Sequence, residues 1–225
     1  MSPHTAALAA LLAERYSCRG FLPQPVPRET IEKILEIAQR TPSWCNSQPW
    51  RLVITSGAAT ERFREALYDH AQRHEATPDY AFPREYRGVY LERRRECGFQ
   101  LYAAVGVQRG DREAGNRQTM ENFRLFGAPH AAIITTEEAL GIYGAIDCGA
   151  YVNNFMLAAK SLGVASIAQA ALARHPQFTR EFFGLPEARR IVCGISFGFE
   201  DAKHPANRFR TSRAALDAVA DWRDA

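Results

Sequence analysis

TPSWCNSQPW, at residues 41–50, lies between two apolar patterns of different period. Residues 31–38 carry apolar side chains at helical spacing, which predicts an amphipathic helix that Pro42 ends. Residues 50–55, WRLVIT, predict a strand. The stretch is therefore expected to be a loop that joins a helix to a strand.

A further helix is expected at the start of the chain, where leucines recur at helical spacing at Leu8, Leu11 and Leu12. Thr5 is a candidate N-cap for it, and we expect the helix to be amphipathic. The helix runs into RYSCR at residues 15–19, and a proline-rich, extended segment follows.

Downstream of the loop, helices and strands are expected to alternate. A helical pattern runs through residues 63–71, and residues 77–117, rich in arginine and aromatic side chains, predict helical pieces and loops. A buried strand is expected at residues 130–136. The remaining elements are a largely apolar helix that ends at Gly163, a strand, a helix, a strand and a polar tail with a short helix (residues 142–162, 164–167, 176–183, 190–197 and 214–222).

Length and composition indicate one globular domain. The 225 residues are 46% hydrophobic and 24% charged, and no repeat or long linker divides them, so we expect one α+β domain over residues 1–225. No apolar run reaches the roughly 20 residues that a membrane span needs, and the first residues lack the pattern of a secretory leader. We therefore expect a soluble, cytoplasmic protein without a membrane partner.

Charge and cysteine content exclude several classes of protein. The net charge of +3 is too small to require a nucleic acid as partner. The five cysteines form no C-x-x-C pair, which disfavours a disulfide framework and a structural zinc site. Of the 28 basic residues only three are lysines, so almost every cation is an arginine, the side chain suited to bidentate recognition of phosphate or carboxylate.

Two arginine groups stand out. Arg15 and Arg19 flank Ser17 directly after the first predicted helix. A second group follows the last predicted strand, at Arg208, Arg210 and Arg213. Both groups would bind one dianionic phosphate if the fold brings them together.

Other arrangements have a simpler structural reading. His70 and His74 are spaced for a metal site, but no third ligand is identifiable and a solvated helix face explains them. Cys45 beside Asn46 is a thiol without an identifiable histidine partner. The arginines of residues 84–95, which would suit RNA, are interleaved with carboxylates that cancel most of their field.

Two motifs carry a resemblance to a known family. RYSCR at residues 15–19 resembles the R-x-S-x-R/K opening of the flavin-dependent nitroreductase family, and residues 41–50 are similar to its P-S-x-x-N-x-Q-P-W loop. The resemblance extends over nearly the whole chain and is greatest for members of the nitrobenzoate-reductase type. Further matches lie at residues 122–123, 126–129, 162–169 and 207–210.

The resemblance implies a fold and an assembly. Members of this family have a central mixed, mostly antiparallel sheet flanked by helices, and they form intertwined homodimers with FMN at the interface. By this resemblance, residues of about 69–117 would form a variable flap near the substrate. Residues of about 201–225 would form an arm that wraps the partner.

The resemblance also implies roles for single residues. Arg15, Arg208 and Arg210 would clamp the FMN phosphate, with Ser17 as a further donor and Tyr16 beside it. Arg19 would lie near the pyrimidine edge, where negative charge develops on reduction. The partner subunit would contribute Pro42, Ser43, Asn46 and Gln48, and the backbone amides of Ile167, Ala168 and Gln169 would face N5. The last group departs from other members, which carry an acidic residue and glycine where this chain has Ala168 and Gln169.

The implied reaction needs no catalytic side chain, because flavin N5 accepts and donates the hydride. NAD(P)H would reduce FMN and leave, and a small nitroaromatic compound, or a quinone, would then bind in the same space, giving ping-pong kinetics. The residues expected near such a substrate are Trp44, Tyr80, Phe82, Tyr86 and Arg87.

Rival functions remain open from the sequence. Relatives on this scaffold also resemble reductive dehalogenases, enone reductases and flavin-consuming enzymes. A flavin-binding protein without turnover is a further alternative, and a nucleic-acid module is the least favoured.

Overall fold

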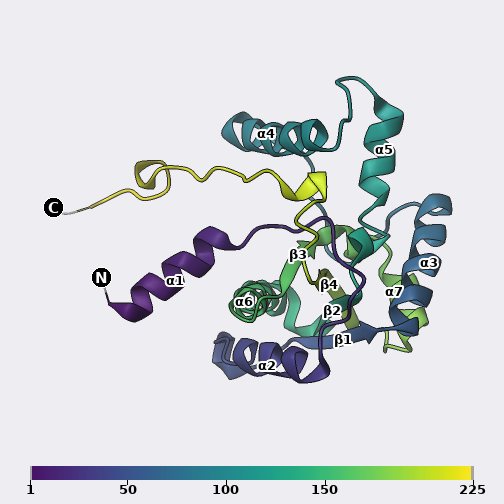
Figure 1. Cartoon of the computed structure of the whole chain (residues 1–225). Helices are drawn as coiled ribbons and strands as arrows, with labels where there is room; N and C mark the ends of the chain where they lie inside the picture. Colours follow the sequence, from purple (N-terminus) through teal and green to yellow (C-terminus); the bar gives the residue numbers. More distant parts are fainter. Residues whose placement is uncertain (1, 224–225) are drawn as a thin grey trace.

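A four-stranded antiparallel sheet forms the centre of the computed structural model, which describes residues 2–223 (Figure 1). The strands lie in the order β1-β2-β4-β3, so β1 and β3 are the two edges. Their bounds are β1 Arg51–Ser56, β2 His130–Glu137, β3 Ala165–Gln169 and β4 Arg189–Gly198. The α+β class expected from the sequence is confirmed.

Seven α-helices surround the sheet, and short 3-10 turns connect several of the elements. The α-helices are α1 Pro3–Glu14, α2 Arg28–Ala38, α3 Ala58–Arg73, α4 Gly88–Ala104, α5 Arg112–Met120, α6 Gly141–Ser161 and α7 Pro176–Phe183. The 3-10 turns used below are η1 Trp44–Asn46, η5 Pro205–Asn207 and η6 Leu216–Ala218. Within residues 2–223, no helix is long and apolar enough to cross a membrane.

The sheet is buried on both faces. Strand β2 is buried from His130 to Thr136, and its side chains alternate between two cores. Ala132 and Ile134 belong to the core formed with α2 and α6, whereas Ala131 and Ile133 belong to the core formed with α3 and α7. The continuous apolar run in the sequence therefore marks a central strand.

One parallel contact extends the sheet beyond β3. Ser17 forms an isolated parallel bridge with Ser166, and the Cys18 N–H donates to the Ser166 carbonyl at 3.2 Å. The segment between α1 and α2 therefore lies along the outer edge of β3. This contact accounts for the mixed character expected of the sheet, whose four named strands are all antiparallel.

The first helix differs from the expectation. Ser2, not Thr5, is its N-cap, because the Ser2 hydroxyl accepts from the Thr5 N–H. Its leucines do not form a buried stripe, since no residue of α1 is buried and Leu8 and Leu12 are half exposed. The expected amphipathic packing is therefore wrong for the single chain.

The C-terminal tail also differs. The helix expected over residues 214–222 is reduced to the single turn η6, and the other residues of this range form no helix or strand. Figure 1 shows this tail and α1 projecting to the same side of the molecule. Residues 77–117 contain α4 and α5 joined by a loop, as the expected helical pieces.

Candidate functional site

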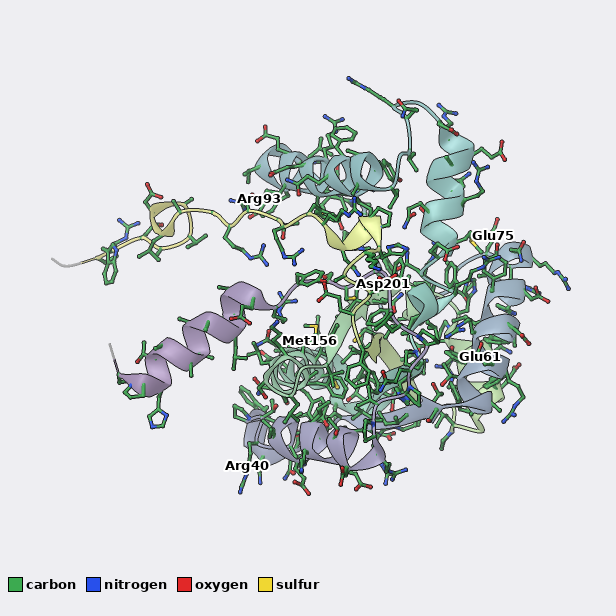
Figure 2. All side chains as sticks on the ribbon, in the orientation of Figure 1. Arg40, Glu61, Glu75, Arg93, Met156 and Asp201 are labelled. Carbon is green, nitrogen blue, oxygen red and sulfur yellow. The ribbon has the colours of Figure 1, made fainter. Side chains whose placement is uncertain are left out.

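Residues 15–19 cross the C-terminal segment where that segment leaves the sheet. The Arg19 N–H donates to the Asn207 side-chain oxygen at 2.7 Å, and the Asp201 N–H donates to the Gly20 carbonyl at 3.0 Å. Asp201, labelled in Figure 2, marks this crossing. Two arginine groups that are far apart in sequence are thereby brought to one place.

Aromatic rings hold the arginine side chains of this crossing. The Arg210 guanidinium carbon lies 3.5 Å from the centroid of the Tyr16 ring, a cation–π contact. Arg19 lies 5.8 Å from the centroid of Phe209 and donates to the Ser17 carbonyl at 3.2 Å.

Arg15 follows α1 at this crossing, and Arg208 lies on the adjoining C-terminal segment. Burial, and to a lesser degree the charge of Arg213, lowers the pKa of Arg15, so these two cations lie within electrostatic reach of each other. Arg208, which is exposed, donates to the Lys203 carbonyl at 3.2 Å.

Glycine is required at position 20 for this crossing. A Cβ at Gly20 would clash with the His204 ring, because it would lie closer to the ring than non-bonded atoms of folded proteins approach one another. The Gly20 carbonyl also accepts from the Asn207 side-chain amide at 2.9 Å. The close approach of residues 201–207 therefore depends on the missing side chain.

The arginines of the crossing form no ion pairs within residues 2–223. Among residues 2–223, no carboxylate lies within salt-bridge distance of Arg15, Arg19, Arg208 or Arg210. Burial lowers the pKa of Arg19 as well as that of Arg15. Two half-buried guanidinium groups, Arg15 and Arg19, and two exposed ones, Arg208 and Arg210, are available to an anionic ligand.

The outer edge of β3 adds backbone groups to this region. Because the Ser166 carbonyl points away from β4 toward Cys18, the alternation of an extended strand directs the N–H and C=O of Ala168 to the same outer edge. Ala168 is exposed, whereas Ile167 and Gln169 are buried. The predicted backbone contact is therefore available at Ala168.

Gln169 has a structural role that the sequence did not reveal. Its side-chain amide donates to the Asn122 carbonyl at 3.0 Å, and its oxygen accepts from the Ser196 hydroxyl. The bond from Ser196 ties β3 to β4, and the bond to Asn122 ties β3 to the turn before β2. In that turn Leu125 and Phe126 have positive φ angles of 57° and 52°, an uncommon conformation for such side chains.

The loop of residues 42–48 forms a second group of predicted residues. The Gln48 N–H donates to the Ser43 hydroxyl at 2.9 Å, and the Gln39 side chain donates to the Gln48 side-chain oxygen at 2.9 Å. Asn46 and Gln48 have positive φ angles of 54° and 45°. Backbone strain of this kind clusters at ligand-binding sites. Pro42, Asn46 and Gln48 are exposed, and Ser43 is half-buried.

Helix α6 separates the two groups of residues. Lys160, near its C-terminal end, pairs with Glu14 at 3.3 Å beside the arginine crossing. Asp147, near its N-terminal end, accepts from the Trp44 N–H of the loop at 3.1 Å. At 1.5 Å per residue, Asp147 and Lys160 are about 20 Å apart along the helix. Because α6 is seen nearly end-on in Figure 1, this separation lies along the viewing direction. One copy of the chain therefore does not bring the arginines and the loop together.

The residues expected near a substrate fall into separate places. Trp44 lies in the loop, and the Tyr80 hydroxyl lies 3.5 Å from the Gly141 carbonyl at the start of α6. Tyr86 and Arg87 precede α4, with Tyr86 under the Arg94 guanidinium at 5.2 Å. Arg87 is paired with Glu85, and the Phe82 side chain is exposed.

The histidine pair is only partly the solvated helix face that was expected, because His74 is exposed whereas His70 is half-buried. The rings of His70 and His74 stack at 4.0 Å, and His70 also stacks on Phe178 and meets His175 edge-on. No group of three or more metal-ligating side chains occurs within the part of the chain that the structure describes.

Comparisons with known proteins show the family of this chain and its fold. A family model described as the nitroreductase family matches residues 12–199. Nitroreductase NfnB of Mycolicibacterium smegmatis is 36% identical over 212 residues, which are 93% of this chain and 90% of that protein. A 4-nitrobenzoate reductase of Nocardioides sp. is 34% identical over 96% of this chain and 89% of that protein. The crystal structure of the FMN-dependent nitroreductase NfnB from Mycobacterium smegmatis in complex with NADPH is similar with a TM-score of 0.92 and 34% identity, covering 97% of this chain and 99% of that one. With the family's residue pattern, its fold and relatives of this similarity along almost its whole length, the chain belongs to the nitroreductase family.

Proposed function

We propose that this protein is an FMN-dependent oxidoreductase that uses NAD(P)H to reduce small nitroaromatic compounds, and that it acts as a homodimer. FMN supplies the group that accepts a hydride from the nicotinamide and passes it to the substrate. The protein's own residues bind and orient the reactants. Relatives described as FMN- and NADPH-dependent nitroreductases and as a 4-nitrobenzoate reductase support this reaction class.

The arginine crossing fits the phosphate end of FMN. Arg15, Arg208 and Arg210 would bind the phosphate through charge-assisted hydrogen bonds, with Ser17 as a further donor. The Arg210 guanidinium lies over the face of the Tyr16 ring, and this contact helps to position Arg210. The observation that carries the proposal is the placement of Arg15, Arg19 and Arg210 at one crossing, where none of them forms an ion pair with a carboxylate of residues 2–223.

Arg19 and the edge of β3 fit the ring system. Arg19 also lines a hollow of about 560 Å³ shared with Phe126 and His204. There its fixed charge would stabilise negative charge at the pyrimidine edge. The exposed N–H of Ala168, with its neighbours Ile167 and Gln169, would face N5.

A second copy of the chain completes the site. The loop residues Pro42, Ser43, Asn46 and Gln48 lie about 20 Å along α6 from the arginine crossing, so they would close over the flavin of a partner subunit. The leucines exposed on α1 and the apolar side chains exposed on the tail, Leu216, Val219 and Trp222, supply surface for such an assembly.

The state of the cysteines indicates the cellular compartment in which the protein acts. All five are free, and we propose that the protein acts in the cytoplasm, where thiols stay reduced.

The proposal is tested on the purified protein. We expect the visible spectrum of oxidised flavin, bleaching by NADH or NADPH without oxygen, and recovery of the spectrum when 4-nitrobenzoate is added. Protein that cannot be reconstituted with FMN would refute the arginine assignments. Turnover of halophenols but not of nitroarenes would show that the enzyme is a reductive dehalogenase and not a nitroreductase.

A matched pair of variants tests the phosphate clamp. Arg210→Gln should raise the Kd for FMN by about 10- to 100-fold, the loss expected for a hydrogen bond to a charged group. Arg28→Gln, which removes an exposed arginine on α2 paired with Glu32, should leave the Kd unchanged. Equal FMN affinity in both variants, measured by fluorescence titration of the apoprotein, would contradict the clamp.

A further inference from the structure

We propose that Trp44 and Tyr143 form an aromatic shelf that stacks on the ring of a planar, electron-poor substrate. Asp147 is the positioning residue that holds this shelf. The inference rests on the proposed function, because it assigns substrate-binding residues to the same two-subunit site.

The shelf joins the loop to α6. The ring centroids of Trp44 and Tyr143 are 5.1 Å apart and their planes are inclined by 45°, a favourable geometry for an aromatic pair. Tyr143 lies in the first turns of α6, and Trp44 begins η1. The two rings therefore form one surface built from two elements.

The exposure of the shelf distinguishes it from a packing contact. Trp44 is 64% exposed and Tyr143 is 57% exposed. On the same helix, the pair of Trp50 and Tyr151 has almost the same ring separation, 4.9 Å, but is 6% and 2% exposed. The chain thus buries one Trp–Tyr pair in its core and leaves the other at the surface of the single chain.

Asp147 positions the loop half of the shelf. Its carboxylate accepts from the Trp44 N–H at 3.1 Å. Tyr143 and Asp147 are four residues apart on α6, so both lie on one face of the helix and contact Trp44 from the same side. The next residue, Cys45, has a positive φ angle of 49°, and the Asp147 bond helps to fix this strained backbone.

The chemistry of the rings suggests the ligand. Indole and phenol rings present electron-rich faces, and a nitro group withdraws electrons from the ring that carries it, so stacking between the two is favourable. The shelf stands beside Ser43 and Asn46, the loop residues that would close over the partner's flavin. A ring stacked there would be held next to the reacting group of the proposed enzyme.

Kinetics of the FMN-loaded enzyme test the shelf with two electron acceptors. Tyr143→Ala and Trp44→Ala should each raise KM for 4-nitrobenzoate by about two- to tenfold, the range expected for loss of an aromatic pair. Turnover of ferricyanide, which has no ring to stack, should stay at the wild-type rate. Ile142→Ala, an equally exposed neighbour on a different face of α6, is the matched control and should behave as wild type with both acceptors.

Two variants of Asp147 distinguish the positioning of Trp44 by its hydrogen bond from a general loss of protein stability. Asp147→Ala should raise KM for 4-nitrobenzoate as Tyr143→Ala does. Asp147→Asn should restore the wild-type value, because its side-chain oxygen still accepts from the Trp44 N–H. Wild-type KM in the Tyr143→Ala and Trp44→Ala variants, or an equal loss with ferricyanide, would overturn the shelf.

A binding measurement decides the inference independently of turnover. 4-Nitrobenzoate should quench the tryptophan fluorescence of the wild-type protein more strongly than that of the Trp44→Phe variant, which keeps Trp50 and Trp222. Absorption of light by 4-nitrobenzoate, the inner-filter effect, lowers the measured fluorescence of both proteins equally. If wild-type protein reduces no nitroarene yet shows this difference, the proposed function fails and the shelf stands; equal quenching overturns the shelf.

Discussion

His130 shows how one buried side chain makes the protein sensitive to pH. It is fully buried at the start of β2, and its Nε2 accepts from the Val26 N–H at 2.9 Å. The hydrogen is therefore on Nδ1, which donates to the Thr55 carbonyl at 3.1 Å. A second proton on Nε2 would remove the bond from Val26, which fastens the segment before α2 to the sheet.

Acid should destabilise the protein through this residue. Burial lowers the pKa of His130 below its ordinary value of about 6.5. Just below pH 6.5, therefore, the unfolded chain binds a proton at this residue that the folded chain does not bind. The free energy of unfolding should then fall by up to about 1.4 kcal/mol for each pH unit in this window. Above pH 7 the effect is absent.

Urea unfolding at pH 7.5 and 5.5 measures this loss. His130→Gln keeps an acceptor for the Val26 N–H but cannot titrate, so its stability should be lower at pH 7.5 and should fall less on acidification. His4→Gln, at an exposed histidine of α1, should keep the wild-type slope. The same slope in all three proteins would contradict the assignment.

Among the elements, the segment between α3 and α4 depends on one buried carboxylate. The Asp79 side chain is 4% exposed and accepts from Arg180 at 2.6 Å, from Arg190 at 3.4 Å and from the Ile191 N–H at 2.7 Å. These three donors lie on α7 and β4. The carboxylate thus fastens the segment that carries Tyr80 against the sheet.

Loss of this carboxylate should be costly. Asp79→Ala leaves the guanidinium of Arg180, 13% exposed, without its partner, and we expect the free energy of unfolding to fall by about 3–5 kcal/mol. Asp69→Ala removes an exposed ion pair with Arg73 and should cost less than about 1 kcal/mol. Chemical denaturation of both variants measures the difference, and equal midpoints would rule out the anchoring role of Asp79.

At the scale of the whole molecule, the single chain leaves much apolar surface open. Helix α1 buries no residue, and Figure 1 shows it projecting beside the extended tail. Leu8, Leu12 and the tail residue Trp222 are at least half exposed. Surface of this kind is typical of an interface between subunits.

Assembly should depend on these leucines. By analytical ultracentrifugation we expect a mass of about twice 25.2 kDa. Replacing Leu8 and Leu12 together by Glu should give the single-chain mass and lower the FMN content, because each flavin would lose the partner's loop. His4→Glu adds charge to the same helix without removing a leucine and should remain dimeric. A dimeric, flavin-loaded double variant would show that α1 does not hold the subunits together.

Local patterns in the sequence were sufficient for most elements. The apolar run at 130–136 predicted a buried strand, and the bounds of α7 agree to the residue. These predictions hold because hydrophobic periodicity indicates which side chains are buried, and each of these elements packs against the core of its own chain. The same argument fails for α1 and the tail, whose apolar side chains find no place in that core.

The site required the tertiary structure. Motifs in the sequence pointed to the arginines and to the loop, but only the folded chain places Arg210 against Tyr16 and separates both from the loop by the length of α6. Tyr143 had no signal beyond being aromatic, since its role follows from a ring 99 positions earlier in the chain. Local sequence encodes backbone preference and burial, whereas a site depends on contacts between distant segments, which exist only after the core has formed.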